Sequence, residues 1–297
     1  MSILPTSQPE FTSVVINKNA DGTLSKDPLS NMYSPLFLRA LEYIYGSEGI
    51  ISSGGIESVD IMLANINLDN KTLLDVGCGF GGVDLHLAKK YKVIITGVDR
   101  EPFMIECANK LLERSLAPLK GRVTYQTLSD PLSLKEFADN TFDLVLCKQV
   151  LYHLPSVKRE LYLKEMYRVL KPGGTIITED LLTASQPYTE LVNRALNIDA
   201  VKENLQLQEA FCYLITPVEY SSLMSNAGFK NINHVDNTDQ QIEYTTKDIQ
   251  RIQNSSEYFS KELGKDTYEF VVDVWNKFVM AMKPHELISG IFTATKK

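Results

Sequence analysis

The chain of 297 residues is long enough to bury a substantial core, and its 44% hydrophobic and 23% charged residues are typical of a soluble globular protein. A formal net charge of -7 argues against a broad basic surface for nucleic acid. The N-terminus lacks the pattern of a signal peptide, and no apolar stretch is long enough to span a bilayer. We therefore expect a cytoplasmic protein that binds neither nucleic acid nor membranes.

The first part of the chain is predicted to contain an irregular arm and two helices. Residues 1–32 are polar and rich in Ser, Thr, Asn and Asp, which favours irregular structure. Hydrophobic residues at helical spacing then predict a helix from Tyr33 to about Gly46 and a second helix over residues 56–66. These two helices would form a cap over residues 33–70.

Short β-rich segments alternate with helices between residues 71 and 180. This alternation is typical of a parallel sheet with helices on both faces. The predicted strands cover residues 73–77, 93–99, 122–127, 142–149 and 174–180, and the predicted helices cover residues 83–90, 102–112 and 157–170.

The alternation of strands and helices ends after residue 180. Helical patterns are predicted over residues 187–206, 217–226 and 245–282, and closing strands over residues 229–239 and 288–297. We expect one domain over residues 33–297, with a cofactor-binding core at 71–180 and a helical lid at 181–228 and 240–285. The lid would lie over the carboxyl ends of the strands, where open α/β sheets bind ligands.

The segment TLLDVGCGFGGVDLHLAKKY, residues 72–91, carries a glycine-rich turn between a strand and a helix. Its GCGFGG satisfies the dinucleotide pattern G-x-G-x-x-G, and Asp99 lies about twenty residues further on, as that pattern also requires. Asp75, however, lies two residues before Gly77, where a carboxylate would repel a pyrophosphate and attract an ammonium group. No Gly-Lys-Ser/Thr follows the glycines, which excludes a P-loop. S-adenosylmethionine offers an ammonium group and no phosphate, so it fits this turn best.

Two further carboxylates fit the same cofactor. Asp99 could accept both ribose hydroxyls, and Asp130 follows the third predicted strand, where it could accept the adenine amino group. The four cysteines form no CxxC pair, and no spacing of His, Cys and carboxylates suggests a metal site. We predict that these cysteines are reduced packing residues: Cys78, Cys107, Cys147 and Cys212.

The motifs LLDVGCGFGG, GVD, FDLVLCKQVLYH and VLKPGG resemble those of class I S-adenosylmethionine-dependent methyltransferases. This resemblance implies an α/β, Rossmann-like sheet of seven strands, with the last strand inserted antiparallel. The segments EYIYGSEGIISSGGIES and GIFTATKK are similar to the phosphoethanolamine N-methyltransferase family. The resemblance implies S-adenosylmethionine as the cofactor, S-adenosylhomocysteine as its product, and these cofactor contacts: Ile51, Ser52, Asp75, Gly77, Gly79, Asp99, Arg100, Asp130, Pro131 and Lys148.

His153 is the candidate for assisting proton loss from an amine acceptor, because imidazole titrates in the useful range. The resemblance to the family implies that His153 pairs with Tyr33 as a catalytic latch. The alternatives are structural: His153 could bond a backbone carbonyl at a helix start, and Tyr33 could cover the core.

The substrate region departs from the family. Lys148 and Gln149 stand where the family has Arg-Asp, and the lid segment contains Tyr213 but no Arg. Phe278 or a neighbour falls where the family has a phosphate-binding Lys. A buried phosphate without basic donors would be costly. We therefore expect a small acceptor less anionic than phosphoethanolamine, methylated on an amine nitrogen and contacted by Gln149 and Tyr213.

Other functions stay open. The acceptor atom could be oxygen or carbon, with His153 deprotonating a hydroxyl or an acidic carbon. The chain could also be a non-catalytic cofactor-binding module that uses its lid to contact a protein partner. An NAD-dependent oxidoreductase is disfavoured by Asp75 and by VLKPGG. The sequence predicts no particular oligomeric state.

Overall fold

The computed structural model of the chain describes residues 35–115, 119, 121–196 and 212–297. The predicted arm at 1–32 and Tyr33 therefore lie outside the described residues. The same holds for the part of the predicted helix 187–206 that follows residue 196.

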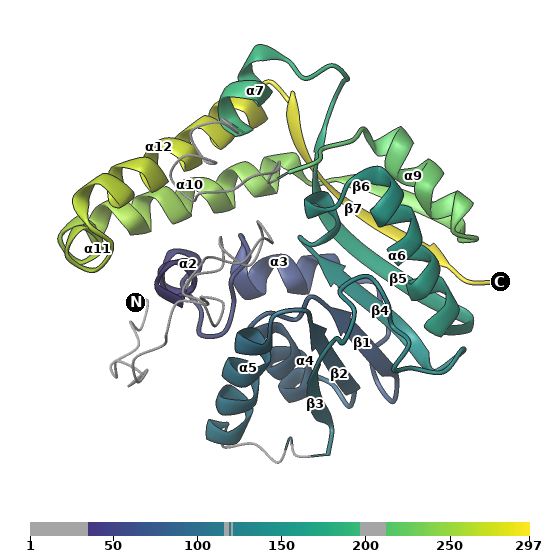
Figure 1. Cartoon of the computed structure of the whole chain (residues 1–297). Helices are drawn as coiled ribbons and strands as arrows, with labels where there is room; N and C mark the ends of the chain where they lie inside the picture. Colours follow the sequence, from purple (N-terminus) through teal and green to yellow (C-terminus); the bar gives the residue numbers. More distant parts are fainter. Residues whose placement is uncertain (1–34, 116–118, 120, 197–211) are drawn as a thin grey trace, which may run out of the picture.

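The described residues form one seven-stranded sheet with the strand order β3-β2-β1-β4-β5-β7-β6 (Figure 1). Neighbouring strands from β3 to β5 are parallel, whereas β7 pairs antiparallel with both β5 and β6. This confirms the predicted sheet and the return of the last strand to it. The strands are β1 Thr72–Val76, β2 Ile94–Asp99, β3 Val123–Thr127, β4 Phe142–Lys148, β5 Leu170–Thr183, β6 Lys230–Asp236 and β7 Leu287–Thr295.

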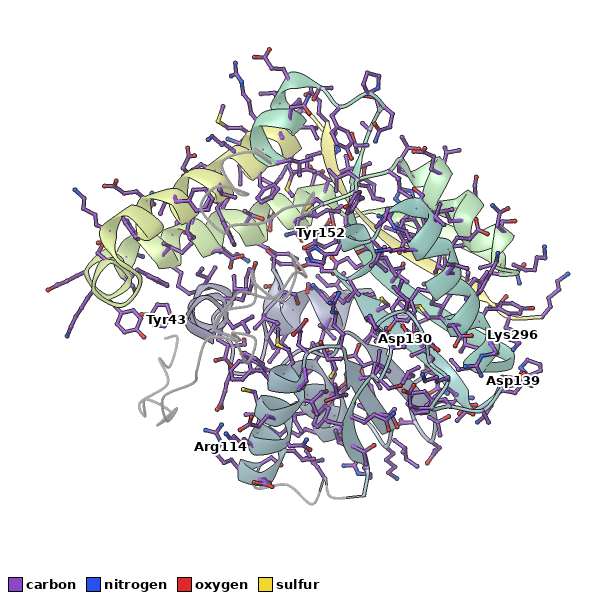
Figure 2. All side chains as sticks on the ribbon, viewed as in Figure 1. Tyr43, Arg114, Asp130, Asp139, Tyr152 and Lys296 are labelled. Carbon is purple, nitrogen blue, oxygen red and sulfur yellow. The ribbon has the colours of Figure 1, made fainter. Side chains whose placement is uncertain are left out.

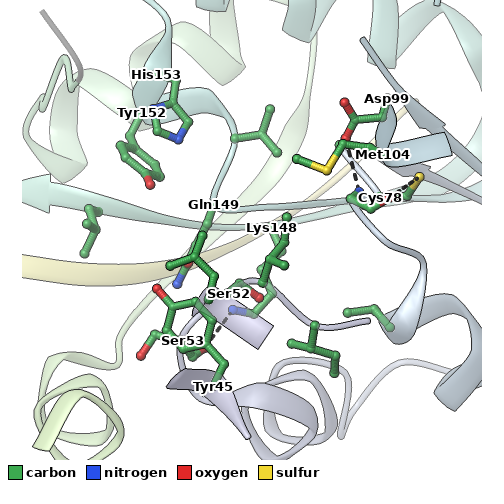
Figure 3. A pocket seen from close by; sticks show the side chains of 18 of the residues that line it. Tyr45, Ser52, Ser53, Cys78, Asp99, Met104, Lys148, Gln149, Tyr152 and His153 are labelled. Atoms are coloured by element: carbon green, nitrogen blue, oxygen red, sulfur yellow. Dashed lines mark hydrogen bonds between the residues drawn. The ribbon is translucent and has the colours of Figure 1, made fainter. Parts of the chain in front are cut away.

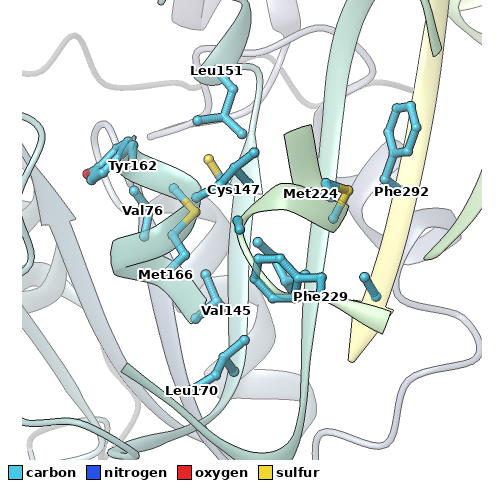
Figure 4. Packing of buried hydrophobic residues seen from close by; sticks show 14 of the residues in the cluster. Val76, Val145, Cys147, Leu151, Tyr162, Met166, Leu170, Met224, Phe229 and Phe292 are labelled. Carbon is cyan, nitrogen blue, oxygen red and sulfur yellow. The ribbon is translucent and has the colours of Figure 1, made fainter. Parts of the chain in front are cut away.

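The sheet is covered on both faces because its central strands are apolar on both sides. Leu73 and Leu144 belong to a hydrophobic cluster with α3 and α4, while their neighbours Leu74 and Val145 belong to a cluster with α6 and α9. Figure 4 shows the second cluster, with side chains from β4, α6 and α9 in contact across the sheet face. The covering helices are α3 Gly55–Met62, α4 Gly82–Lys90, α5 Pro102–Arg114, α6 Ser156–Val169 and α9 Pro217–Asn226.

Local signals explain several helix boundaries. Helix α5 begins at Pro102, whose missing N–H costs nothing in the first turn. Helix α9 follows Thr216, whose hydroxyl accepts the backbone N–H of Glu219, while the Glu219 carboxylate accepts the backbone N–H of Thr216. This capping box fixes the start of α9 at the predicted residue.

The lid consists of α7 Glu190–Leu196, α10 Thr238–Asn254, α11 Ser256–Leu263 and α12 Lys265–Met282, and α2 Pro35–Tyr45 lies close to α10 (Figure 1). Helix α12 packs against both α10 and α7. Among the described residues, no helix is both long and apolar enough to cross a membrane.

The prediction of one helical stretch over residues 245–282 was wrong. The helical stretch begins at Thr238, where the Asp236 carboxylate accepts the Thr238 backbone N–H at 2.9 Å. Strand β6 therefore ends at Asp236, three residues before the predicted end at 239. The chain then leaves the helical conformation at Ser255 and at Gly264, whose φ is 84°. A left-handed φ favours glycine and interrupts a helix.

Candidate functional site

A cavity lies at the carboxyl ends of β1, β2 and β4, between the sheet and the lid (Figure 3). In Figure 3, Asp99 and Cys78 lie on one side of the cavity and Tyr152 and His153 on the other, with Gln149 between them. The structure brings most of the predicted site residues into its lining: Ile51, Ser52, Asp75, Gly77, Gly79, Asp99, Arg100, Pro131, Lys148, Gln149 and His153.

The glycine turn between β1 and α4 needs its glycines for conformation and for space. Gly77 and Gly79 have φ values of 79° and 53°, which side chains other than glycine rarely adopt. A Cβ at Gly77 would lie 2.4 Å from Cγ2 of Val150. The Gly77 N–H also donates to the Val98 carbonyl at 2.8 Å, which attaches the turn to β2. The turn is therefore rigid, and it keeps the backbone close to any bound ligand.

Asp99 joins the end of β2 to the glycine turn. Its two carboxylate oxygens accept the backbone N–H groups of Gly79 at 3.1 Å and Glu101 at 3.0 Å. Burial raises the pKa of Asp99 to about 6, although these hydrogen bonds favour the charged form. The carboxylate is thus fixed in position with one edge toward the cavity lining.

Asp75 is a buried carboxyl group at the end of β1. Burial, together with the nearby charge of Asp99, raises the pKa of Asp75 to about 7, whereas the charge of Lys148 opposes this rise. Asp84 on α4 is fully buried, and burial together with the charge of Asp75 raises the pKa of Asp84 well above its usual range. Near neutral pH the pair therefore holds at least one proton, and a cation that binds beside Asp75 favours its ionised form.

The loop from Gly49 to Gly55 is attached to both the sheet and the lid. The Gly82 N–H donates to the Gly49 carbonyl at 3.0 Å, and a Cβ at Gly82 would lie 2.5 Å from the carbonyl carbon of Gly49. The Ser53 hydroxyl donates to Asp248 of α10 at 3.0 Å. The loop is therefore pinned between α4 and the lid, next to the glycine turn.

Lys148 at the end of β4 is an ion-paired residue. Its Nζ lies 2.9 Å from Glu179 Oε2 and donates to the Ser53 carbonyl at 3.1 Å. The other Glu179 oxygen accepts a hydrogen bond from the Asn237 side-chain amide at 2.7 Å. Lys148 thus lines the cavity with its charge already matched by a buried carboxylate.

Gln149 and His153 frame the region beyond β4. Gln149 has a φ of 57°, a left-handed conformation stabilised by its N–H, which donates to the Glu179 carbonyl at 2.7 Å. His153 is buried in the 3₁₀ turn η1 Leu151–His153, and its ring lies 4.0 Å from the Tyr152 ring, centroid to centroid.

Arg159 of α6 holds this turn in place. The Arg159 side chain is fully buried, with Nε donating to the Leu151 carbonyl at 2.9 Å and Nη2 donating to the Leu154 carbonyl at 3.0 Å. Nη2 also donates to the Tyr213 carbonyl at 2.6 Å. The two bonds to residues 151 and 154 bracket His153, so Arg159 fixes the backbone that presents the imidazole.

Two of the predicted site residues that the structure describes, Asp130 and Tyr213, are not in the cavity lining. Asp130 is exposed, and its carboxylate accepts the Leu132 N–H at 3.1 Å, so it stabilises its own loop (Figure 2). Tyr213 contributes backbone groups instead, donating its N–H to the Tyr152 carbonyl at 2.8 Å. Tyr33 lies outside the described residues, so its predicted pairing with His153 stays a prediction.

Sequence reasoning missed most of the lid side of the cavity. Helix α12 contributes apolar residues spaced by three or four positions, which place them on one face of the helix. That spacing is visible in the sequence, but it indicates only a covered face and not a cavity wall. The missed lining residues include Tyr45, Met104, Tyr152, Gln241, Thr245, Phe270, Val274, Trp275 and Met282.

The four cysteine side chains are packing residues in the structure. All four cysteines are free and buried, which confirms that they pack as small apolar residues. Within the described ranges, no group of three or more His, Cys, Asp or Glu side chains is placed to hold a metal ion.

Comparison with known proteins finds a methyltransferase domain and methyltransferase relatives. A methyltransferase domain model matches residues 74–178. Phosphoethanolamine N-methyltransferase 1 of Zea mays is 28% identical over 283 residues, covering 95% of this chain and 52% of that protein. Phosphoethanolamine N-methyltransferase of Plasmodium falciparum is 25% identical over 285 residues, covering 96% of this chain and 99% of that protein. The chain spans about half the length of the curated plant relatives it matches.

Comparison with solved structures also finds a phosphoethanolamine N-methyltransferase. Phosphoethanolamine N-methyltransferase 2 of Haemonchus contortus, solved with phosphomonomethylethanolamine and S-adenosylhomocysteine, superposes with a TM-score of 0.76 at 22% identity, over 92% of this chain and 60% of that chain. At this identity the match shows the fold. Together with the seven-stranded sheet, these findings show that the chain contains a methyltransferase domain, has the class I S-adenosylmethionine-dependent methyltransferase fold, and is similar to the phosphoethanolamine N-methyltransferases.

Proposed function

We propose that the protein transfers a methyl group from S-adenosylmethionine to an amine nitrogen of a small molecule. The observation that carries this proposal is one continuous cavity with two different ends. The carboxylates of Asp75 and Asp99 lie at the glycine turn, and Gln149 and His153 lie beyond β4. A cationic cofactor and a neutral nucleophile could therefore meet between them.

The cofactor end matches the groups of S-adenosylmethionine. A buried Asp75 favours the ligand's ammonium group, and Asp99 offers carboxylate edges to ribose hydroxyls. The Leu128 N–H donates to the Asp99 carbonyl at 2.9 Å, which places Leu128 beside Asp99. Leu128 and Pro131 together provide an apolar surface for adenine. When bound, the cofactor supplies an electrophilic methyl group on a sulfonium.

The acceptor end supplies alignment, exclusion of water and a base. Methyl transfer is an in-line displacement, so a rigid wall that orients the nucleophile contributes most of the catalysis. The turn that carries His153 is held by Arg159, and the ring lies in the cavity lining. In this proposal His153 accepts the proton that an amine must lose.

The charged residues of the lining argue against phosphoethanolamine as the acceptor. Lys148, the lysine of this lining, is ion-paired with Glu179, and Arg100 lies 3.2 Å from Glu101. A phosphate group would therefore find no unmatched Arg or Lys among the lining side chains that the structure describes. The scaffold of the relatives is retained, and the acceptor is a less anionic amine.

The test of the cofactor assignment is the Asp75→Asn variant, titrated with S-adenosylmethionine by isothermal titration calorimetry. We expect its affinity to fall by roughly 10- to 100-fold, the usual loss when a charge-assisted hydrogen bond is removed. For the wild type, affinity should rise between pH 5.5 and 7.5, because Asp75 has a pKa of about 7 and binds the ammonium group when ionised. In Asp75→Asn the remaining rise should shift toward pH 6, the pKa of Asp99.

The control is Asp139→Asn, which changes an exposed carboxylate far along the chain from the glycine turn and outside the lining. Its affinity should equal that of the wild type. Tight binding of NAD without binding of S-adenosylmethionine would contradict the cofactor assignment. Methylation of a hydroxyl or an acidic carbon instead of an amine would leave the cofactor assignment intact and overturn the choice of acceptor atom.

A further inference from the structure

The lid side of the cavity is an aromatic wall that the methyl-transfer mechanism does not use. Resting on the proposed function, we propose that the acceptor is an amine attached to a flat apolar body, and that Gln241 positions its nitrogen. The body would lie against Phe270, Trp275 and Phe278 of α12.

The residues that form this wall are all apolar. Trp275 and Phe278 contact each other edge to face, with ring centroids 6.4 Å apart and an interplanar angle of 80°. Both rings are only partly buried, so they offer unused apolar surface to the cavity. Leu181, Leu196 and Met282 complete this part of the lining. Such a wall stabilises a bound hydrophobic group and offers no favourable contact to a phosphate.

Gln241 of α10 adds one polar group with a defined orientation. Its side chain lines the cavity and is 3% exposed. The Thr245 hydroxyl donates its single proton to the Gln241 backbone carbonyl at 2.8 Å, so toward the Gln241 side chain it can only accept. The nitrogen Nε2 of Gln241 therefore faces Thr245, at 3.4 Å, which leaves Oε1 as the remaining acceptor of the side chain.

The oxygen Oε1 of Gln241 is buried and has no hydrogen-bond partner among the described residues. A buried amide oxygen that lacks a donor is costly, so a ligand that brings an N–H group to this point is favoured. The acceptor is a neutral amide oxygen, and the carboxylates of the described lining, Asp75 and Asp99, lie at the glycine turn. The site therefore favours an amine over an anion.

This arrangement also selects the reactive form of the amine. Apolar surroundings lower the pKa of an ammonium group, so the bound acceptor gives its proton to His153 before attack and its nitrogen then carries a free lone pair. One N–H donates to Gln241 Oε1 while the nitrogen lone pair forms the new N–C bond. The C–S bond breaks with its electron pair moving to sulfur, and the methylated product leaves as the ammonium.

Trp275 provides a direct test, because it is the single tryptophan of the chain and it lines the cavity. With S-adenosylhomocysteine bound, phenethylamine should change the tryptophan fluorescence and bind about 10- to 100-fold more tightly than ethanolamine or phosphoethanolamine, the gain for burying one phenyl ring. Phenethylamine should also be the preferred acceptor in turnover, and 2-phenylethanol should not be methylated.

Two pairs of variants locate the effect. Phe278→Ala should weaken phenethylamine binding about 10-fold or more, while Met280→Ala, which changes an exposed residue of the same helix, should not. Gln241→Met should weaken it by a similar factor, while Gln240→Met, at the exposed neighbouring position, should not. Affinity for S-adenosylmethionine should be unchanged in all four variants.

The outcomes separate this inference from the proposed function. Preference for phosphoethanolamine, methylation of 2-phenylethanol, or failure of phenethylamine to bind would overturn the inference while leaving cofactor binding and methyl transfer standing. An unchanged affinity for phenethylamine in Gln241→Met would overturn the role of Gln241 alone. Absence of S-adenosylmethionine binding in the wild type would instead overturn the proposed function on which the inference rests.

Discussion

The His153→Ala variant is expected to lower kcat by about 10²- to 10⁴-fold, the usual contribution of a general base, with no change in affinity for S-adenosylmethionine. The reason is the position of the imidazole. His153 lies in the cavity lining beyond β4, on a turn fixed by Arg159, whereas the cofactor carboxylates lie at the glycine turn. Its loss should therefore affect the acceptor's proton and leave the cofactor contacts intact.

The pH dependence distinguishes a base from a structural residue. As the pH rises from 7 to about 9.5, an alkylamine acceptor loses more of its proton to solvent, so the defect of His153→Ala should shrink. The matched control is His86→Ala, which removes an imidazole that bonds Asp60 at 2.8 Å on α3, outside the lining. Unchanged turnover in His153→Ala, or a defect that stays constant with pH, would contradict the base assignment.

Replacement of Arg159 by Met is expected to lower the free energy of unfolding by about 3–5 kcal/mol, the range for breaking a buried charged network. The Arg159 guanidinium donates to three carbonyl oxygens, at residues 151, 154 and 213, and its side chain is fully buried. Its charge also faces Asp180, whose buried carboxyl accepts the Tyr220 hydroxyl at 2.6 Å. The variant removes all three of these hydrogen bonds and leaves the buried Asp180 carboxyl without the nearby positive charge.

Urea denaturation followed by circular dichroism measures this loss. Lys158→Met serves as the control, because Lys158 is the exposed neighbour on the same helix. Its stability should stay within about 0.5 kcal/mol of the wild type, as is usual for surface substitutions. A similarly small change in Arg159→Met would show that the carbonyl groups around η1 find other donors, and would remove the argument for a fixed His153.

The sheet could be predicted from the sequence because each signal was local. Apolar runs such as 73–77 and 142–149 are buried on both faces, and they alternate with helices long enough to cross the sheet. The predicted start of α9 at Pro217 agrees with the structure for the same reason, since the capping box that begins the helix involves only residues 216–219. The prediction of a cofactor site at the glycine turn also depended on a local signal, because Asp75 and Gly77 are only two positions apart.

The lid and the acceptor end could not be predicted, because their properties depend on contacts between distant segments. Whether Gly264 interrupts a helix depends on the packing of α11 against α12, and the helical pattern continues on both sides of it. The oxygen Oε1 of Gln241 is recognised as lacking a hydrogen-bond donor only when the positions of Thr245 and the cavity are known. Asp130 had the expected position after a strand, but its loop turns the carboxylate toward its own backbone.

The most direct measurement is the crystal structure of the protein with S-adenosylhomocysteine. We expect the ligand's ammonium group within hydrogen-bond distance of Asp75, its ribose hydroxyls on Asp99, and its sulfur directed toward the space between Gln149 and His153. The aromatic wall of α12 should then be separated from that sulfur by the volume of an acceptor. Density for the ligand outside this cavity, or with its sulfur directed away from His153, would contradict the proposed methyl transfer.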